Sequence, residues 1–324
     1  MHRRILLTAG AALALSMTGA ALAQGVYPDK PIKLLVGYAP GGSADIAARL
    51  AARELTLELN QPVIVENRPG AGGNIASEML TRARPDGYTL LMGATAQIVI
   101  NPSLYKNMTF NPIKDMAPVT LMQNEYKLLV MNPKVPAKTL KEFIAYAKAH
   151  PTGVTFGSPG IGSPAHLAGE LMNQQAGLTM LHVPFKGTSA SVANLVSGNV
   201  TMAIDNMPAL LPQVKAGALR ALAVASEKRA PAAPNIPTMQ EAGLPGFVVP
   251  AWKGLMAPAG TPRPIIDRLN AAMVKILAKP EVRKQMLDLG ADPVGNTPEE
   301  FATMIKAQTV KWAALVKSTG TTLQ

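Results

Sequence analysis

Two kinds of hydrophobic pattern alternate along most of this chain. Short apolar runs rich in Val, Ile and Leu are separated by longer segments in which apolar residues recur at helical spacing. The first pattern predicts strands and the second predicts amphipathic helices. Their alternation is typical of an α/β protein with largely parallel sheets. The strands are predicted at residues 32–36, 63–66, 89–92, 127–131, 154–157, 180–182, 200–204 and 219–225.

Helix starts are clearly signalled at two places. Thr139 is followed three residues later by Glu142, which is a capping-box pattern. Thr297, Pro298 and Glu300 combine a capping hydroxyl, a proline at the first helical position and an acid at the third. The second start predicts a long closing helix. Its apolar stripe consists of Phe301, Met304, Ile305, Trp312, Leu315 and Val316.

The chain is long enough to predict two domains, because 324 residues exceed what one hydrophobic core ordinarily supports. Two passages rich in Pro and Gly, 111–132 and 230–264, are interpreted as crossings between the domains. With two crossings, residues 26–124 and 230–324 form the first lobe. Residues 125–229 form the second.

The N-terminus has the features of a secretory signal. A positive start with Arg3 and Arg4 precedes an almost wholly apolar or small stretch, and Ala21-Leu22-Ala23 matches a cleavage site. A membrane-spanning helix is the alternative, but the stretch is rich in Ala, Gly and Thr and lacks stop-transfer charges after it. No Cys follows the cleavage site, which excludes a lipoprotein anchor. Residues 1–23 are therefore predicted to be removed, leaving a soluble periplasmic protein.

The amino-acid composition excludes several classes of functional site and partner. The absence of cysteine excludes disulfides, a thiol nucleophile and a Cys-based metal site. The net charge of +11 comes from Lys and Arg in runs no longer than two, and aromatic residues make up only 4%. That is too few for a base-stacking platform, so nucleic acid is not predicted as a partner. A mild positive field that attracts carboxylates is the better interpretation.

The first candidate site is the junction at residues 34–45. An apolar run ends in Pro40-Gly41-Gly42 and a helical pattern begins at once, so backbone N–H groups and a helix N-terminus converge on one spot. Such a junction suits a carboxylate or phosphate. Asp45 would repel an anion unless its oxygens face loop N–H groups or a ligand amine, and helix capping is the favoured role.

A second junction of the same kind runs from Gly157 to Ser163 and leads into a helix with Pro164 at its first position. Ser163 is the predicted N-cap, and the hydroxyls of Ser158 and Ser163 are candidate donors. The alternative is an ordinary glycine-rich turn before a capped helix. These observations leave both open.

Two further polar residues follow predicted strands. Lys186 is either the cation that faces an acidic ligand or a solvated surface lysine, and Asp205 either binds a ligand hydroxyl or amine through water or forms a turn. All four loops follow predicted strands, and ligands of open α/β sheets bind at the carboxyl ends of strands. This agreement predicts one shared binding site.

Enzyme motifs are missing from the sequence. Gly41-Gly42-Ser43 lacks the lysine of a P-loop, and no G-x-S-x-G elbow surrounds Ser158 or Ser163. His166 and Glu170 have a zinc-compatible spacing, but no H-E-x-x-H is present, so His166 is expected to pack behind the second glycine loop. No catalytic residue, metal or cofactor is predicted.

Several short motifs occur along the mature chain. Ala-Pro-Gly-Gly-Ser-Ala-Asp at 39–45 is one of them, and Asp-Asn-Met-Pro at 205–208 is another. The others are at residues 27–32, 66–73, 85–90, 183–187, 221–224, 237–246 and 257–262. In sequence and in order, these motifs resemble those of the Bug family of periplasmic solute-binding proteins, the receptors of tripartite tricarboxylate transporters.

The resemblance implies a type II periplasmic-binding-protein fold, in which two α/β lobes, joined by two crossing segments, close on an organic acid in the cleft between them. It also implies a monomer that delivers this ligand to membrane transporter subunits. Carried over by motif, the first loop supplies Tyr38, Ala39, Gly42, Ser43 and Asp45, the second supplies Ser158, Gly162, Ser163 and His166, and Lys186 and Asp205 face the far end of the ligand.

Ala44 departs from the family pattern, in which a polar residue often precedes this Asp. Its effect is either weaker carboxylate anchoring or room for a bulkier ligand. The glycine loop at 66–73 is interpreted as structural.

The sequence leaves the ligand and the downstream role open. Dicarboxylates, tricarboxylates, acidic amino acids and aromatic carboxylates all fit. Tyr38, Phe185, Met207 and Trp252 are either an apolar pocket lining or core residues. A sensor that presents its closed form to a signalling partner is the alternative to transport. An exported enzyme is the least favoured hypothesis.

Overall fold

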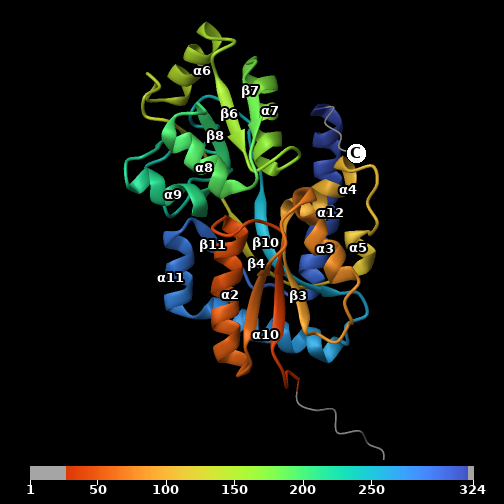
Figure 1. Cartoon of the computed structure of the whole chain (residues 1–324). Coiled ribbons are helices and arrows are strands. Elements are labelled where there is room, and N and C mark those ends of the chain that lie inside the picture. The colour runs from red at the N-terminus through yellow and green to blue at the C-terminus, as the bar shows by residue number, and fades with distance from the viewer. Residues whose placement is uncertain (1–26, 320–324) are drawn as a thin grey trace, which may run out of the picture.

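The structure, a computed structural model, describes residues 27–319 and contains two β-sheets with helices around them (Figure 1). The predicted signal peptide, residues 1–23, lies outside the described residues. The first sheet has the strand order β11-β4-β10-β3-β1-β2 and the second has the order β7-β6-β8-β5-β9. The strands are β1 Ile32–Val36, β2 Val63–Asn67, β3 Thr89–Ala94, β4 Met116–Glu125, β5 Lys127–Met131, β6 Thr155–Ser158, β7 Leu181–Pro184, β8 Met202–Asn206, β9 Arg220–Val224, β10 Ala251–Pro258 and β11 Ala291–Pro293.

The helices divide between the two sheets, with α6 to α9 around the second sheet and most of the others around the first (Figure 1). Helix α12 packs on β4 and also touches α7, so it contacts both halves of the molecule. The helices are α2 Ser43–Leu59, α3 Asn74–Thr81, α4 Asn101–Leu104, α5 Pro112–Asp115, α6 Leu140–Ala149, α7 Pro164–Ala176, α8 Thr188–Ser197, α9 Met207–Lys215, α10 Arg263–Ala278, α11 Pro280–Asp288 and α12 Pro298–Thr319, with short turns η1 Ala71–Gly73 and η2 Ala96–Ile100.

The α/β class is confirmed, but the sheets are mixed rather than largely parallel. Strand β1 is parallel to β2 and β3, and β6 is parallel to β7 and β8. Strand β10 runs antiparallel to β3 and β4, and β5 runs antiparallel to β8 and β9. The antiparallel members include the strands that carry the chain from one sheet to the other and back.

Strands β4 and β10 lie inside the two passages interpreted as crossings, and sequence patterns missed both. Every residue of β10 is buried, because this strand lies between β3 and β4. Lys253 and Gly254 interrupt the apolar run of β10, so the sequence pattern does not predict a buried strand there. Pro118 of β4 sits beside a register shift in the β4–β10 ladder, where a missing N–H is tolerated.

The first crossing is very short. Strand β4 ends at Glu125 and β5 begins at Lys127, so Tyr126 alone separates the two sheets. After β9 the chain stays with the second sheet for some distance, since Met239 N donates to Val224 O and Val249 N donates to Ala225 O. The lobe boundaries at 124/125 and 229/230 stay a prediction, and these bonds favour a second crossing nearer residue 250.

The capping predictions are confirmed. Thr139 Oγ1 accepts from Glu142 N at the start of α6. At the start of α12, Thr297 Oγ1 accepts from Glu300 N and the Glu300 carboxylate accepts from Thr297 N. These reciprocal bonds satisfy amide groups that a helix leaves open at its first turn.

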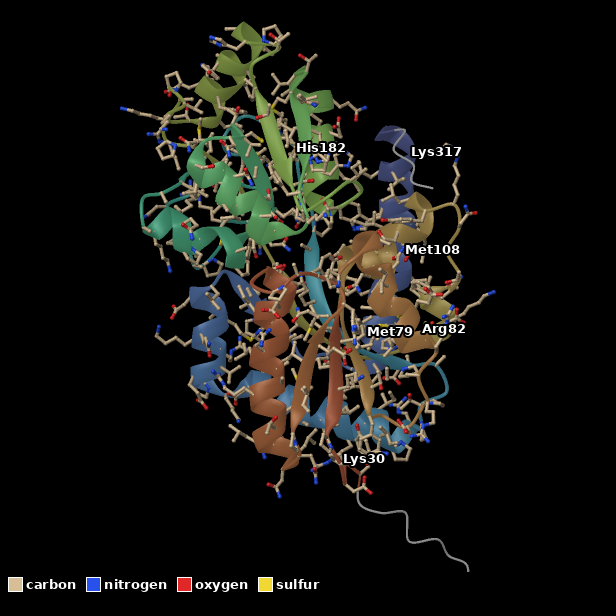
Figure 2. All side chains as sticks on the ribbon, in the orientation of Figure 1. Lys30, Met79, Arg82, Met108, His182 and Lys317 are labelled. Carbon is tan, nitrogen blue, oxygen red and sulfur yellow. The ribbon has the colours of Figure 1, made fainter. Side chains whose placement is uncertain are left out.

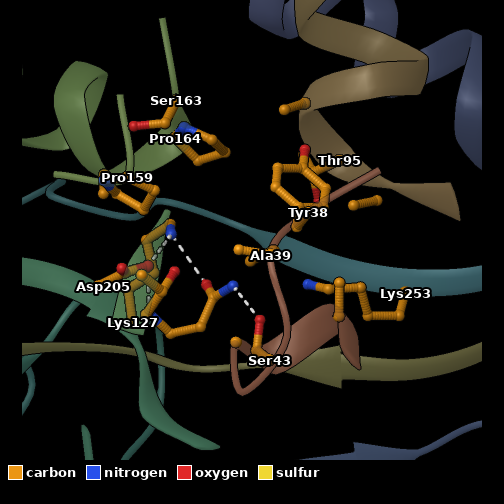
Figure 3. A pocket seen from close by; sticks show the side chains of 18 residues that line it. Tyr38, Ala39, Ser43, Thr95, Lys127, Pro159, Ser163, Pro164, Asp205 and Lys253 are labelled. Atoms are coloured by element: carbon orange, nitrogen blue, oxygen red, sulfur yellow. Dashed lines mark hydrogen bonds and ion pairs between the residues drawn. The ribbon is translucent and has the colours of Figure 1, made fainter. Parts of the chain in front are cut away.

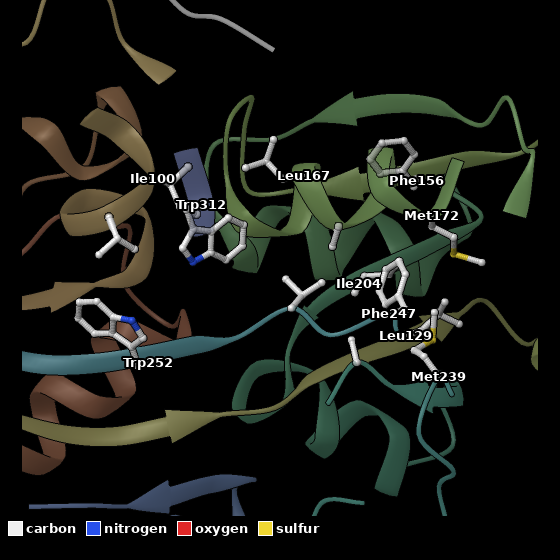
Figure 4. Packing of buried hydrophobic residues seen from close by; sticks show 14 of the residues in the cluster. Ile100, Leu129, Phe156, Leu167, Met172, Ile204, Met239, Phe247, Trp252 and Trp312 are labelled. Atoms are coloured by element: carbon white, nitrogen blue, oxygen red, sulfur yellow. The ribbon is translucent and has the colours of Figure 1, made fainter. Parts of the chain in front are cut away.

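The apolar stripe of α12 also packs as predicted. Phe301 and Trp312 are buried, and the Phe301 ring meets the Trp252 ring edge-on at 5.3 Å between centroids. One hydrophobic cluster extends from Trp252 and Ile100 to Leu167 and Phe156 in the second lobe (Figure 4). No helix in the described part of the chain is long and apolar enough to cross a bilayer.

Candidate ligand-binding site between the lobes

A cavity of about 50 Å³ lies between the two lobes (Figure 3). A single water needs about 10–15 Å³ on the same measure, so this cavity has room for a group the size of a carboxylate. We call it the inner cavity. Its lining is Tyr38, Ala39, Gly42, Ser43, Ala44, Ala94, Thr95, Ala96, Ala251 and Lys253 from the first lobe and Lys127, Pro159, Ser163, Pro164, Ala165, Thr188, Asp205 and Asn206 from the second.

A larger hollow of about 800 Å³, the outer hollow, adjoins it. The two share Tyr38, Ala39, Ala96, Pro159 and Ser163 as lining residues. The outer hollow is lined further by residues 69–73, Tyr105, the glycine loop 160–162 and residues 184–187. A ligand whose acidic end fills the inner cavity would therefore have space to extend outward. The loop at 66–73 supplies part of this lining as well as close packing.

The first glycine loop brings four of its predicted residues to the inner cavity: Tyr38, Ala39, Gly42 and Ser43. Gly42 is the N-cap of α2 and Ser43 is its first residue, so the positive end of the helix faces the cavity. Gly41 has a φ of 80°, a value that favours glycine. This sharp turn is what places the helix N-terminus directly after β1.

Asp45 faces away from the cavity and lines neither hollow. Its carboxylate accepts hydrogen bonds from Gly41 N at 2.9 Å, Asn67 Nδ2 at 3.0 Å and Arg49 Nε at 2.9 Å. Burial alone would raise the pKa of Asp45, but these hydrogen bonds hold it below its ordinary value. Asp45 therefore shapes the loop and stays ionised without repelling an anion in the cavity.

The second glycine loop contributes fewer residues to the lining of the inner cavity than the first loop does. Ser163 lines the inner cavity, but its Oγ accepts from His166 N as the N-cap of α7. Gly162 lines the outer hollow, and its N donates to His166 Nδ1 at 3.1 Å. Ser158 is fully buried, with its Oγ 2.6 Å from His182 Nε2. Ser158 and His166 thus lie behind the loop and line neither hollow.

His166 and His182 form a stacked pair behind this loop, with ring centroids 4.0 Å apart (His182 is labelled in Figure 2). Burial lowers the pKa of His166 to about 4, and burial together with the neighbouring His166 lowers that of His182 to about 4. Both rings are therefore neutral at pH 7. Their hydrogen bonds to Gly162 and Ser158 hold the loop in position.

Lys186 and Asp205, predicted to face the same end of the ligand, lie in different places. Lys186 is exposed and lines the outer hollow. Asp205 is in β8, 4% exposed, and lines the inner cavity. Of the candidate apolar residues, Phe185 lines the outer hollow, whereas Met207 and Trp252 are fully buried in the core.

Sequence reasoning missed the buried cations of the inner cavity. Lys127 is 1% exposed and Lys253 is 3% exposed, and both line the cavity (Figure 3). Lys253 Nζ pairs with Glu125 Oε2 at 2.7 Å, and Gln123 Nε2 donates to Glu125 Oε1 at 2.7 Å. A single lysine within a buried apolar strand, as in Lys127-Leu128-Leu129-Val130, was the available signal, because such a group must find a polar partner.

Lys127 lacks an equally close anion. Its Nζ donates to Asn206 Oδ1 at 2.9 Å and lies 4.0 Å from Asp205 Oδ1. Burial lowers the pKa of Lys127 to about 8, and burial raises the pKa of Asp205 above its ordinary value. An anion in the cavity would compensate the buried ammonium, and this arrangement can bind a carboxylate. Within residues 27–319 no group of three or more His, Asp or Glu side chains could hold a metal ion.

Comparison with known proteins identifies the family of this chain. Residues 47–321 match the family described as the tripartite tricarboxylate transporter family receptor. The chain belongs to this family. Protein BugT of Bordetella pertussis is 37% identical over 322 residues, covering 99% of each chain. The recognition of a Bug-type receptor from sequence motifs is therefore confirmed.

Solved structures of relatives show the same fold. The periplasmic binding protein BugD has a TM-score of 0.87 at 34% identity, covering 92% of this chain and 100% of that one. Rpa4515 of R. palustris with adipate has a TM-score of 0.89 at 32% identity, covering 91% and 98%. MatC of Rhodopseudomonas palustris with bound malate has a TM-score of 0.84 at 35% identity, covering 90% and 100%. The predicted two-lobe periplasmic-binding-protein fold is confirmed.

These relatives are binding proteins rather than enzymes. This receptor of the tripartite tricarboxylate transporter family is accordingly a periplasmic solute-binding protein.

Proposed function

We propose that this receptor captures a small organic carboxylate between its lobes and delivers it to the membrane subunits of a tripartite tricarboxylate-type transporter. The observation that carries the proposal is the pair of buried lysines, Lys127 and Lys253, in a cavity that also receives the N-terminus of α2. Ammonium groups and a helix N-terminus both favour an anion.

Capture uses contacts from both lobes. The carboxylate first meets the N-terminus of α2 at Ser43, and the second lobe then adds Lys127. Two hydrogen bonds already join the lobes around the cavity, from Asn206 Nδ2 to Ser43 Oγ at 2.9 Å and from Ser189 Oγ to Pro40 O at 3.0 Å. Because these contacts exist only when the lobes approach, ligand binding shifts the protein toward the closed arrangement.

The ligand class that we propose is a dicarboxylate. The relatives solved with adipate and with malate each hold a dicarboxylate. In this chain the inner cavity has space for one acidic end, and the outer hollow takes the remainder of the ligand. Lys186, exposed at the outer hollow, would then face the second carboxylate.

The mature protein is proposed to act as a monomer after removal of residues 1–23. Release into the periplasm would bring it to the transporter subunits in the inner membrane. Cleavage after Ala23 can be read directly from the N-terminal sequence of the protein recovered from the periplasm.

A thermal-shift screen of the mature protein against organic acids tests the binding proposal, with sugars as controls. A ligand that binds only the folded state adds about 2.7 kcal/mol of stability at a hundredfold excess over its dissociation constant. Stabilisation by dicarboxylates supports the proposal, and a response to sugars alone contradicts it. Loss of ligand uptake in cells that lack the receptor supports transport, whereas unchanged uptake favours a sensor.

A further inference from the structure

Lys127 has hydrogen-bonding capacity that the protein does not use. An ammonium carries three donors. Within residues 27–319, Nζ of Lys127 donates one hydrogen bond, to Asn206 Oδ1, and its distance of 4.0 Å to Asp205 Oδ1 exceeds hydrogen-bonding range. The side chain is nevertheless almost wholly buried and lines the inner cavity. The remaining donors of this ammonium have no acceptor in the part of the chain that the structure describes.

Asp205 lies beside Lys127 and has an unused hydrogen-bond acceptor. Its Oδ1 accepts from Asn206 N at 2.7 Å. Its Oδ2 is buried and accepts no hydrogen bond of regular geometry among the described residues, although the Thr188 hydroxyl lies near enough to lower the pKa of this carboxyl against the effect of burial. Leaving a buried carboxylate oxygen unsatisfied is costly, so this oxygen calls for a donor. Figure 3 shows Lys127 and Asp205 on the same side of the cavity.

One small group can satisfy both side chains. It must offer anionic oxygen to Lys127 and a hydrogen-bond donor to Asp205, on neighbouring atoms. A 2-hydroxycarboxylate has both features, because its carboxylate and hydroxyl lie on adjacent carbons. We infer that Lys127 and Asp205 together select a ligand with a hydroxyl next to its carboxylate. This inference rests on the proposed function and narrows its ligand class.

A ligand ammonium is a poorer fit than a hydroxyl at this place. The inner cavity already contains the ammonium groups of Lys127 and Lys253. Glu125 is committed to Lys253 and Gln123, which leaves Asp205 as the acid available to balance Lys127. A third cation would add repulsion in a buried site, whereas a hydroxyl adds none. The hydroxy acid is therefore preferred over the corresponding amino acid.

Calorimetry on matched pairs of ligands tests the inference without any variant. The pairs are malate and succinate, 2-hydroxyglutarate and glutarate, and lactate and propionate, with each hydroxy acid tested as both enantiomers. Aspartate and glutamate are the amino analogues. We expect at least one hydroxy acid to bind about tenfold or more tightly than its unsubstituted partner, since its hydroxyl completes a hydrogen bond to a buried charged oxygen.

Two variants separate the roles of the two residues. Asp205→Asn keeps the shape of the side chain but removes its negative charge. It should reduce the ratio of affinities between each hydroxy acid and its unsubstituted partner to about threefold or less. Lys127→Met should weaken both members of each pair by a similar factor, because both carry the carboxylate. Asp267→Asn, an exposed change on α10, is the matched control and should leave the preference unchanged. Circular dichroism and thermal unfolding confirm that each variant is folded.

Each other outcome has a distinct meaning. Equal binding of hydroxylated and plain acids shows that Asp205 Oδ2 is served by a water only, which overturns the inference and keeps the proposed function. Tighter binding of the amino analogues also overturns it. If no carboxylate binds, the proposed function fails together with the inference.

Discussion

The side-chain amide of Asn206 links Lys127 in the second lobe to Ser43 in the first. Its Oδ1 accepts from Lys127 Nζ at 2.9 Å, and its Nδ2 donates to Ser43 Oγ at 2.9 Å. One side chain thus orients the cavity cation and contacts the start of α2. The position of the ammonium is thereby tied to the approach of the two lobes.

Loss of this link should weaken ligand binding. Asn206→Ala removes both hydrogen bonds and should raise the dissociation constant about tenfold, whereas Ser43→Ala removes one and should raise it about threefold to tenfold. Calorimetry with the best ligand of the screen measures both. Ser189→Ala, which removes a hydrogen bond between the lobes outside the inner cavity, is the control and should have a smaller effect. Unchanged affinity in Asn206→Ala would refute the link.

Ligand affinity should depend on pH through Lys127. Burial sets the pKa of Lys127 at about 8, and an anionic ligand binds the charged form. Affinity should therefore fall above pH 8, by up to about tenfold per pH unit. Calorimetry between pH 7 and 9.5 measures the profile. Lys127→Met should give a weaker and flatter profile, and the same slope in this variant would assign the effect to another group.

The same pKa predicts the opposite trend for the ligand-free protein. Between pH 8 and 10.5 the unfolded chain keeps its proton on Lys127 while the folded chain loses it. The unfolded state binds more protons in this window, so the contribution of Lys127 to the free energy of unfolding rises with pH. Urea titrations of the wild type and of Lys127→Met isolate this contribution as a difference between the two slopes.

Removing one partner of the Glu125–Lys253 pair should destabilise the fold. Both side chains are buried and their charged atoms are 2.7 Å apart. Glu125→Gln or Lys253→Met leaves one buried charge without compensation and should cost about 3–5 kcal/mol of unfolding free energy. The double variant should recover much of that loss. Urea denaturation measures all four proteins, and fully additive losses would show that the two charges do not interact.

The histidine pair should make the protein sensitive to acid. The pKa values of His166 and His182 are lowered from 6.5 to about 4, so between these values the unfolded chain binds more protons. The unfolding free energy should therefore fall as the pH drops from 6.5 to 4, by at most about 1.4 kcal/mol per pH unit for each histidine. His182→Gln should reduce this slope in urea titrations. His150→Gln, a change at an exposed histidine, is the control.

Gly254 in β10 should not tolerate a methyl group. A Cβ there would lie 2.3 Å from Phe301 Cζ and 3.0 Å from the Thr120 carbonyl oxygen. Gly254→Ala should cost about 1–3 kcal/mol, because a packed aromatic ring must move. At Gly153 the nearest atom to an added Cβ is 3.7 Å away, so Gly153→Ala is the neutral control. Thermal unfolding compares the two.

Local signals carried the sequence predictions that succeeded. The apolar runs at 32–36 and 127–131 correspond to β1 and β5 residue for residue. The cap of α12 followed from Thr297 and Glu300, which satisfy each other within one turn. Such signals need no knowledge of distant parts of the chain.

Long-range relationships could not be read from the sequence. Lys127 and Lys253 lie in strands of different sheets, and only the folded chain brings them to one cavity. Strand β10 was missed because Lys253 and Gly254 interrupt its apolar run, and the partners that bury them, Glu125 and the Phe301 ring, lie far away in the sequence. The direction of the Asp45 carboxylate depends on Asn67 in the next strand, so the place of Asp45 in the first glycine loop did not by itself indicate that it lines no cavity.

The one-residue crossing at Tyr126 has a mechanical consequence. Glu125 belongs to the first sheet and Lys127 to the second, so the segment on which the sheets would pivot also carries Lys127 of the inner cavity and the ion-pair partner of Lys253. Tyr126 itself is held from both sides, through its carbonyl oxygen by Met207 N and through its hydroxyl by Asp292 Oδ2. A swing of the lobes about Tyr126 would therefore move Lys127 away from Lys253. In the mechanism that we propose, an anion between the two lysines would lose one of its two ammonium neighbours as the lobes open.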